Sequence, residues 1–148
     1  MEQLPTLDFA TTLANLPPQQ LDEGLDEAIA YSLAERFDVV IVLDDDPTGT
    51  QTVYDIPVVT ELTDRAITAE LERGTPLFYL LTNSRALSAA QASWMILNLG
   101  LTIKQACARA GKRPLVIIRG DSTLRGHFDH EDRDLAAGLG RDGQRPFL

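Results

Sequence analysis

The stretch that decides the fold is VVIVLDDDPTGT, residues 39–50. It begins with five consecutive apolar residues, four of them β-branched, which is typical of a strand buried on both faces of a parallel sheet. The strand runs directly into Asp44, Asp45 and Asp46, whose like charges repel one another and contribute nothing to stability. Such a group is expected beside a cation or beside hydroxyl groups that need acceptors, although Asp-Pro and Thr-Gly are also ordinary turn sequences.

Two further apolar runs end in polar loops of the same kind. Residues 77–81 are followed by Thr82–Arg85, and residues 115–118 are followed by RGDSTLRGH, residues 119–127. The arginines of the last loop are forked donors that match a carboxylate or a phosphate, and its carboxylate and hydroxyls suit sugar-type hydroxyl groups. Because ligands of open parallel sheets lie outside the carboxyl ends of the strands, we expect the three loops to meet at one edge.

The elements alternate along the chain. The helical spacing of apolar residues, together with capping residues such as the capping box of Ser88 and Gln91, predicts helices at about 19–36, 64–73, 88–110 and 128–139. An additional strand is expected at 56–60, where Pro57 favours a sheet edge or a strand start. The alternation predicts an α/β fold with a Rossmann-like, mostly parallel sheet flanked by helices. Residues 1–37 are expected to form an N-terminal extension with one helix, and residues 38–148 the domain itself.

Several single residues carry structural expectations. Gly100 interrupts a long helix at a cost of about 1 kcal/mol against alanine, which suggests close packing there. Trp94 and Met95 in the same helix are expected in the core, as is Cys107. The acidic residues of the last helix, Glu131 among them, are expected to form a solvated face.

Composition and charge exclude several classes of protein. Thirteen Lys and Arg against 22 Asp and Glu give a net charge of -9, which argues against binding nucleic acid or an anionic membrane surface. One cysteine and two histidines offer neither an internal disulfide nor a zinc pattern, and no metal site is expected. No apolar run approaches the ~18 residues of a membrane span, and the N-terminus lacks signal-peptide features. We therefore expect a cytoplasmic protein.

The three loops together resemble the four-carbon acid sugar kinase family. The residues that carry the resemblance are DDDPTG at 44–49, TNSR at 82–85 and, above all, DSTLRGH at 121–127. The resemblance covers about residues 38–148. It implies a two-domain, ATP-dependent kinase for acids such as threonate or erythronate, in which the N-terminal domain binds the acid and the C-terminal domain binds ATP.

On this resemblance the chain corresponds to the sugar-acid-binding domain alone. It contains neither a G-x-x-x-x-G-K-[ST] loop nor a G-x-G-x-x-G motif, and RPFL at 145–148 reads as the start of another strand. The chain is therefore expected to be inactive by itself and to need a nucleotide-binding domain or a separate partner chain. ATP and Mg²⁺ would be cofactors of the full-length enzyme, and neither is expected to bind tightly to this chain.

The resemblance also implies a set of substrate-binding residues, but no catalytic residue is assigned. Arginines would bind the substrate carboxylate, and Asp44, Asp45 and Asp121 would accept hydrogen bonds from its hydroxyls. The alternative is that the arginines have no part in binding and either form ion pairs that hold the loops in place or lie on the surface. The full set is Asp44, Asp45, Arg85, Arg119, Asp121, Ser122 and Arg125.

A haloacid-dehalogenase-like, Mg²⁺-dependent phosphatase is the alternative reading. Asp44 would be its nucleophile and Asp46 its acid/base, with Thr82 and Asp121 in the second and fourth motifs. Against it, neither Lys104 nor Lys112 is clearly placed for the third motif, and residues 123–126 have no explanation. Mg²⁺-dependent hydrolysis of an aryl phosphate would distinguish the two functions.

Overall fold

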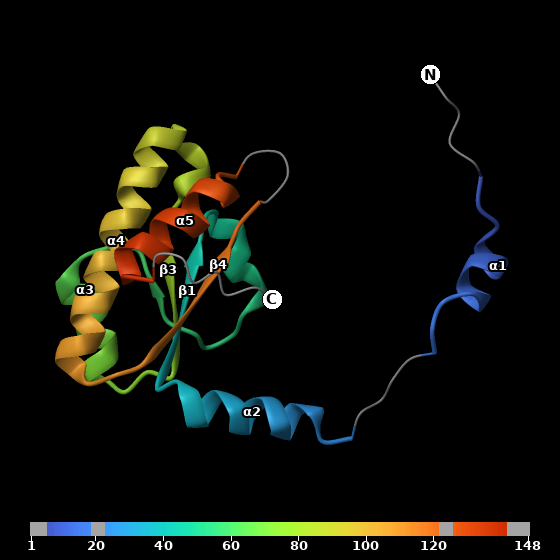
Figure 1. Cartoon of the computed structure of the whole chain (residues 1–148), viewed down its shortest axis with the longest axis horizontal. Helices are drawn as coiled ribbons and strands as arrows, with labels where there is room; N and C mark the ends of the chain where they lie inside the picture. The colour runs from blue at the N-terminus through green and yellow to red at the C-terminus, as the bar shows by residue number, and fades with distance from the viewer. Residues whose placement is uncertain (1–5, 19–22, 122–125, 142–148) are drawn as a thin grey trace. The chain divides into compact units, whose positions relative to one another are not determined.

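The computed structural model describes residues 6–18, 23–121 and 126–141, and its centre is a parallel sheet (Figure 1). Within these residues four strands pair in the order β2-β3-β1-β4, and every pairing is parallel. The strands are β1 (Val39–Asp44), β2 (Val58–Val59), β3 (Leu77–Leu81) and β4 (Pro114–Arg119). The predicted Rossmann-like α/β fold is confirmed. Strand β2, which falls within the predicted strand 56–60, lies at an edge of the sheet, as Pro57 suggests.

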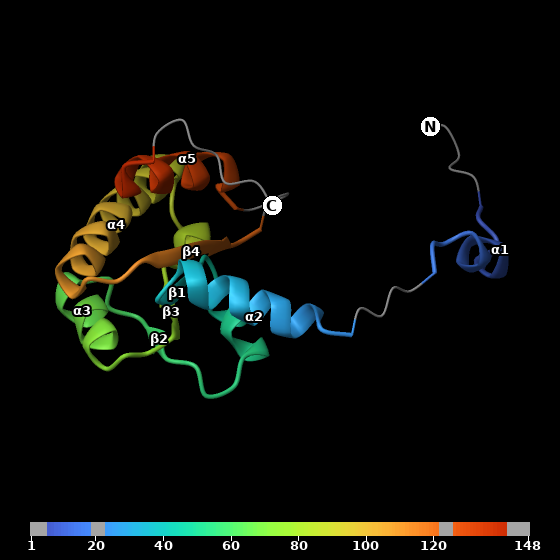
Figure 2. The same ribbon diagram turned by 60° about the horizontal axis from the view of Figure 1, so that its bottom comes forward.

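Three helices lie along one face of the sheet. They are α3 (Asp64–Glu72), α4 (Ala89–Ala110) and α5 (Phe128–Leu139). In Figure 2 the strand labels descend in the order β4, β1, β3, β2, and α5, α4 and α3 follow one another beside them. The ends of α4 are those predicted, because Ser88 and Gln91 form a capping box and Gly111 adopts a left-handed φ of 64°.

The core lies between these helices and the sheet. In the register, Ile41 is paired with Phe78 and Val116, and register partners of parallel strands project to the same face. Alternate residues of β1 therefore meet the helices, where Ile67 and Ile103 complete a fully buried cluster. The intervening residues of β1 project to the other face, so Asp44 and its register partner Arg119 lie on the face without these helices.

Helices α4 and α5 pack closely enough to exclude side chains at one point. A Cβ added to Gly138 would lie 2.4 Å from the Leu97 carbonyl oxygen and 2.9 Å from the Cα of Gly100. Ser93 of α4 also donates a hydrogen bond to Asp134 of α5. The close packing expected at Gly100 is confirmed, and the two glycines provide it.

The chain divides into two units, Met1–Ser32 and Leu33–Leu148. The sequence predicts one helix within residues 1–37, but the structure has α1 (Phe9–Ala14) and α2 (Leu25–Arg36). The additional helix starts at Asp8, whose carboxylate accepts the Thr11 N–H at 2.8 Å as an N-cap. Neither helix contains a buried residue.

Some predictions for single residues are wrong. Trp94 is 70% exposed rather than in the core, whereas its neighbour Met95 does pack against the core. Glu131 is 2% exposed rather than solvated, and among the described residues its Oε1 has no hydrogen-bond partner. Cys107 is buried as expected, and burial raises the pKa of its thiol to about 11.

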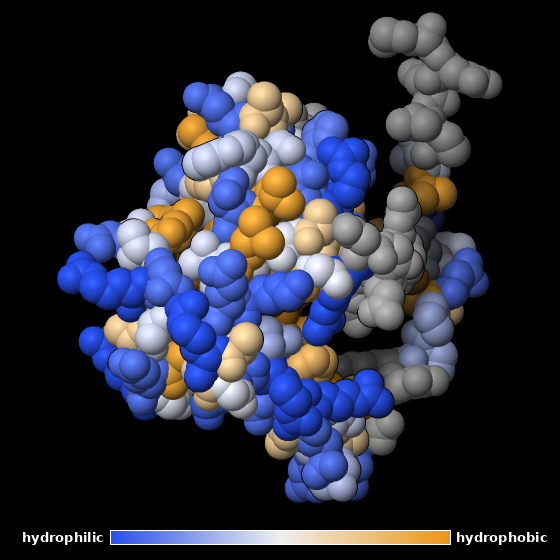
Figure 3. Space-filling view, turned by 60° about the vertical axis from the view of Figure 1, so that its left-hand side comes forward, coloured by the Kyte–Doolittle hydropathy of each residue, from blue (hydrophilic) through white to orange (hydrophobic). Residues whose placement is uncertain are grey.

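No helix in the described part of the chain is long and apolar enough to cross a membrane. Figure 3 shows that the side on which α3 and α4 lie is mostly hydrophilic, with apolar side chains in separate small groups.

Candidate functional site

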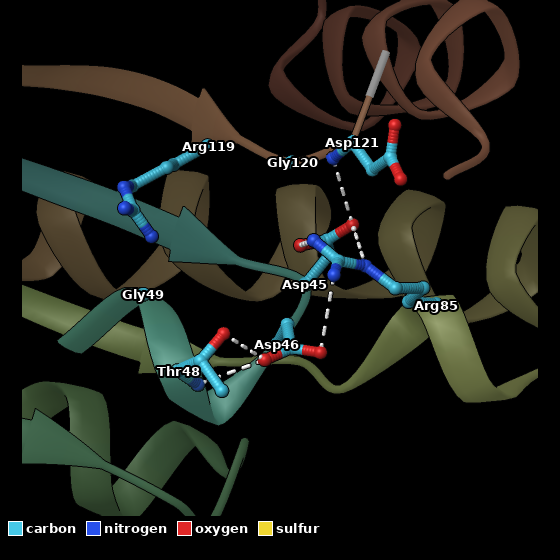
Figure 4. Close-up of a pocket in the computed structure, with 8 residues that line it drawn as sticks. All are labelled: Asp45, Asp46, Thr48, Gly49, Arg85, Arg119, Gly120 and Asp121. Carbon is cyan, nitrogen blue, oxygen red and sulfur yellow. Dashed lines mark hydrogen bonds and ion pairs between the residues drawn. The ribbon is translucent and has the colours of Figure 1, made fainter. Parts of the chain in front are cut away.

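The carboxyl ends of β1, β3 and β4 enclose a polar pocket of about 380 Å³ (Figure 4). The segment after β1 contributes four residues, η2 (Ser84–Ala86) contributes an arginine, and the end of β4 contributes three residues. The three loops therefore meet at one edge, as the sequence predicts. The lining residues are Asp45, Asp46, Thr48, Gly49, Arg85, Arg119, Gly120 and Asp121.

Asp45 and Arg85 form the central ion pair of this pocket. Arg85 donates from Nε to Asp45 Oδ2 at 3.0 Å and from Nη2 to Oδ1 at 2.7 Å, a bidentate arrangement that fixes the plane of the guanidinium. Asp45 is only 3% exposed and also accepts the Asp121 N–H at 3.1 Å. Hydrogen bonding of Arg85 to the Asp45 carboxylate, which accepts these bonds, is the main reason that the pKa of Arg85 is raised from its usual value. Asp45 thus links all three loops.

Asp46 contacts a different edge of the same guanidinium. Its Oδ2 accepts a hydrogen bond from Arg85 Nη1 at 3.2 Å, and its Oδ1 accepts the Thr48 N–H at 2.8 Å. The second contact makes Asp46 the N-cap of the 3-10 helix η1 (Pro47–Thr52). Asp46 is 24% exposed, so this carboxylate is more accessible from the pocket than that of Asp45.

A second ion pair joins the carboxyl ends of β1 and β4. Arg119 donates from Nη1 to Asp44 Oδ2 at 3.1 Å, and Asp44 is 1% exposed. Gly49 lies against this pair, since a Cβ there would be 1.8 Å from Arg119 Nη1 and 2.0 Å from Asp44 Oδ2. Arg119 lines the pocket, but Asp44 does not, so the structure places Asp44 behind the arginine that it orients.

The loop after β3 is fixed by buried hydroxyl groups. The N–H and the Oγ1 of Thr82 both donate to the Asp44 carbonyl, at 2.8 and 2.9 Å, and the Thr82 hydroxyl also contacts the buried Ser84. Asn83 then adopts a left-handed φ of 51° and starts η2, which contains Arg85. Thr82 and Ser84, which are outside the set of substrate-binding residues that the resemblance implies, therefore help to set the position of Arg85.

The loop after β4 begins and ends with close backbone contacts. A Cβ on Gly126 would lie 1.8 Å from the carbonyl oxygen of Asp121, so both ends of the loop meet. Ser122 and Arg125, which the resemblance implicates in substrate binding, lie outside the described residues. His127 Nε2 lies 3.0 Å from the Leu87 carbonyl oxygen and connects the start of α5 to the segment after η2, outside the pocket lining.

Comparison with known families agrees with this geometry. A family described as the sugar-binding N-terminal domain matches residues 40–145, a span that contains all three loops. The chain belongs to this family. The matched domain is the N-terminal domain of the four-carbon acid sugar kinase family. No curated protein and no solved structure gives a significant match to the chain.

The sugar-binding domain assignment does not favour the phosphatase alternative. A nucleophilic Asp44 would have to reach its substrate, but this carboxylate is buried against Arg119 and Gly49. Within the described ranges, no group of three or more His, Cys, Asp or Glu side chains is arranged to hold a metal ion.

Proposed function

We propose that this sugar-binding domain binds a four-carbon sugar acid of the threonate or erythronate type in the pocket at the strand ends. The observation that carries the proposal is the convergence of Arg85 and Arg119 with Asp45, Asp46 and Asp121 around one small polar space. Its volume of about 380 Å³ lies near the lower end of the range of ~300–1,000 Å³ typical of small-molecule sites.

The lining chemistry suits a ligand with several hydroxyl groups. An ionised carboxylate only accepts hydrogen bonds, and each ligand hydroxyl can donate one. The side chains of Asp46 and Asp121 are the acceptors proposed for these hydroxyls, while the more buried Asp45 keeps Arg85 in place. Three of the five N–H groups of Arg85 donate in the bonds to Asp45 and Asp46.

The kinase role of the domain is part of the same proposal. A phosphoryl group would be transferred from ATP, with Mg²⁺, to a ligand hydroxyl, and both cofactors would be brought by a nucleotide-binding domain in the same or a separate chain. Such transfers depend mainly on positioning and on neutralisation of charge. The part of this domain would be to fix the sugar acid by its carboxylate and hydroxyls so that one hydroxyl faces the phosphoryl donor.

The test is isothermal titration calorimetry of the chain with the isomers of erythronate and threonate. We expect Arg85→Lys, which retains the charge but loses the bidentate fork, to weaken binding. The loss of one charge-assisted hydrogen bond costs about 1.5–3 kcal/mol, or roughly tenfold to a hundredfold in affinity.

A matched control is available at the amino ends of the strands, away from the pocket. Arg113 forms an ion pair with Asp38, with Nε to Oδ2 at 3.0 Å, just before the same two strands that end in Asp44 and Arg119. Arg113→Lys should leave the affinity unchanged. Unchanged affinity in a folded Arg85→Lys variant, as judged by circular dichroism, would remove Arg85 from the site.

A further inference from the structure

We propose that His127 is a positioning residue of the pocket: its imidazole ties the turn that carries Arg85 to the start of α5, and the affinity for a sugar acid depends on this contact. His127 does not line the pocket itself. It acts through Arg85, whose place in the site is part of the proposed function. The inference therefore rests on that function, but the contact can also be tested without a ligand.

The His127 ring makes a defined long-range contact. Its Nε2 lies 3.0 Å from the carbonyl oxygen of Leu87, which comes 40 positions earlier in the chain. A carbonyl oxygen only accepts hydrogen bonds, so Nε2 carries a hydrogen and donates it. The neutral Nε2–H tautomer and the imidazolium ion both satisfy this requirement. The contact therefore does not depend on a change of protonation.

The place of His127 in its own helix indicates a role outside that helix. It is the N-cap residue of α5, but its side chain makes no capping hydrogen bond. The side chains of Asp8, Thr63 and Ser88 do cap α1, α3 and α4, with the residue types that are preferred at this position. The His127 side chain is instead engaged with Leu87.

Leu87 closes the turn that carries Arg85. It follows η2 directly, and its N–H donates to the Ser84 carbonyl at 2.9 Å. Its own carbonyl accepts from His127, so both backbone polar groups of Leu87 are bonded. At the start of the turn, the hydroxyl of Thr82 anchors the chain to the end of β1. The Arg85 turn is therefore held at both ends, and His127 provides the second anchor.

The same histidine adjoins the β4 side of the pocket. It follows Gly126, where a Cβ would lie 1.8 Å from the carbonyl oxygen of Asp121, so the backbones at these two positions are in close contact. The Asp121 N–H donates to Asp45 Oδ2, and the same oxygen accepts from Arg85 (Figure 4). The imidazole contact thus closes a ring of contacts around the pocket, in which the ion pair of Asp45 and Arg85 is the opposite link.

Three variants separate this contact from the capping of α5. His127→Gln keeps an N–H donor at the same number of bonds from the backbone as Nε2. His127→Asn introduces a preferred N-cap residue, but its shorter side chain ends before the Leu87 carbonyl. His130→Leu is the matched control, because His130 lies in the same helix, is exposed and contacts Arg133 outside the pocket lining.

Amide hydrogen exchange on the ligand-free chain tests the contact itself. We expect the Leu87 and Asp121 amides to exchange about two- to tenfold faster in His127→Asn than in wild type, which corresponds to one neutral hydrogen bond. His127→Gln and His130→Leu should leave both rates close to those of wild type. Unchanged exchange in His127→Asn overturns the proposal, whether or not the chain binds a sugar acid.

Calorimetric titration with sodium erythronate and threonate tests the effect on the pocket. His127→Asn should bind the acids about two- to tenfold more weakly than wild type. In denaturant unfolding it should nevertheless be at least as stable as His127→Gln, because asparagine caps α5. A purely structural contact would lower stability and affinity together.

The outcomes keep the two proposals apart. Wild-type affinity in His127→Asn, an equal loss in His130→Leu, or a loss of affinity that accompanies a loss of stability overturns the positioning role while the proposed function stands. If the wild type itself does not bind the acids at millimolar concentration, the proposed function fails and the effect on affinity with it. The exchange rates then still decide whether His127 holds the two loops together.

Discussion

At the scale of single residues, the pocket depends on a backbone position that has no side chain. Gly49 lies against the ion pair of Asp44 and Arg119, where an added Cβ would come within 2.0 Å of the carboxylate. Asp44 is enclosed and cannot withdraw, while the half-exposed Arg119 can. A side chain at position 49 is therefore expected to push Arg119 away from Asp44.

We predict that Gly49→Ala destabilises the fold by about 1–3 kcal/mol, the usual cost of overpacking, and weakens sugar-acid binding. Denaturant unfolding and calorimetric titration measure the two effects. Gly120→Ala is the control, because its Cβ would be 3.1 Å from the nearest atom, Asp45 Oδ2, and should cost less. A Gly49→Ala variant as stable as wild type would contradict the tight closure.

Some residue roles follow from the sequence and others do not. The grouping of Asp45, Arg85 and Asp121 is predictable, because polar loops that follow parallel strands share one edge. The pairing of Asp44 with Arg119 is not, because it depends on strand register and on the close approach of Gly49. Burial of Glu131 is also unpredictable from its acidic neighbours, since it depends on how α5 packs.

At the scale of elements, the packing of α4 on α5 relies on two facing glycines. In an ordinary helix interior, alanine is about 1 kcal/mol more favourable than glycine. Here the Cβ of an alanine at 138 would collide with backbone atoms of α4, which cannot move like a flexible side chain. The sequence indicates this contact only through Gly100. That Gly138 faces it depends on how the two helices pack, which the sequence does not show.

We therefore predict that Gly138→Ala destabilises the protein, by about 2 kcal/mol, against its helix propensity. Gly100→Ala should cost less, because its nearest contacts are at 3.1 Å. Thermal or chemical unfolding followed by circular dichroism gives both values. A gain in stability for Gly138→Ala would mean that the helices are further apart than the structure shows.

At the scale of the whole molecule, ion pairs join β1 and β4 at both ends of the sheet. At the amino end, hydrogen bonds from Arg113 lower the pKa of Asp38 from 3.8 to about 2. Because the pKa is lower in the folded state, this carboxylate contributes stability above about pH 4, and the contribution is lost as the pH falls toward 2.

The corresponding prediction concerns acid unfolding. The difference in unfolding free energy between wild type and Asp38→Asn should be largest above pH 4 and should shrink between pH 4 and pH 2. Denaturation midpoints measured at several pH values in this window give the difference. Parallel pH profiles of the two proteins would show that the Asp38–Arg113 pair does not contribute in this way.

The overall architecture is the part that the sequence predicts best. Continuous apolar strands alternating with capped helices indicate a parallel sheet with its site at the strand ends. The strand order β2-β3-β1-β4 and the face on which the helices lie come from three-dimensional packing, which no local pattern encodes. Helix α1 does not follow from the sequence either, because a six-residue helix has too little periodicity to be recognised.

The central claim is that a sugar acid binds at the carboxyl ends of β1, β3 and β4. The most direct test is to follow the backbone amide signals of the ¹⁵N-labelled chain by nuclear magnetic resonance during titration with erythronate and threonate. We predict saturable shifts at the amides of Thr48, Gly49, Gly120 and Asp121, with Arg85→Lys reducing them. No shift up to millimolar ligand, or shifts confined to the separate hollow between β2 and α3 that Thr60 and Arg73 line, would contradict the claim.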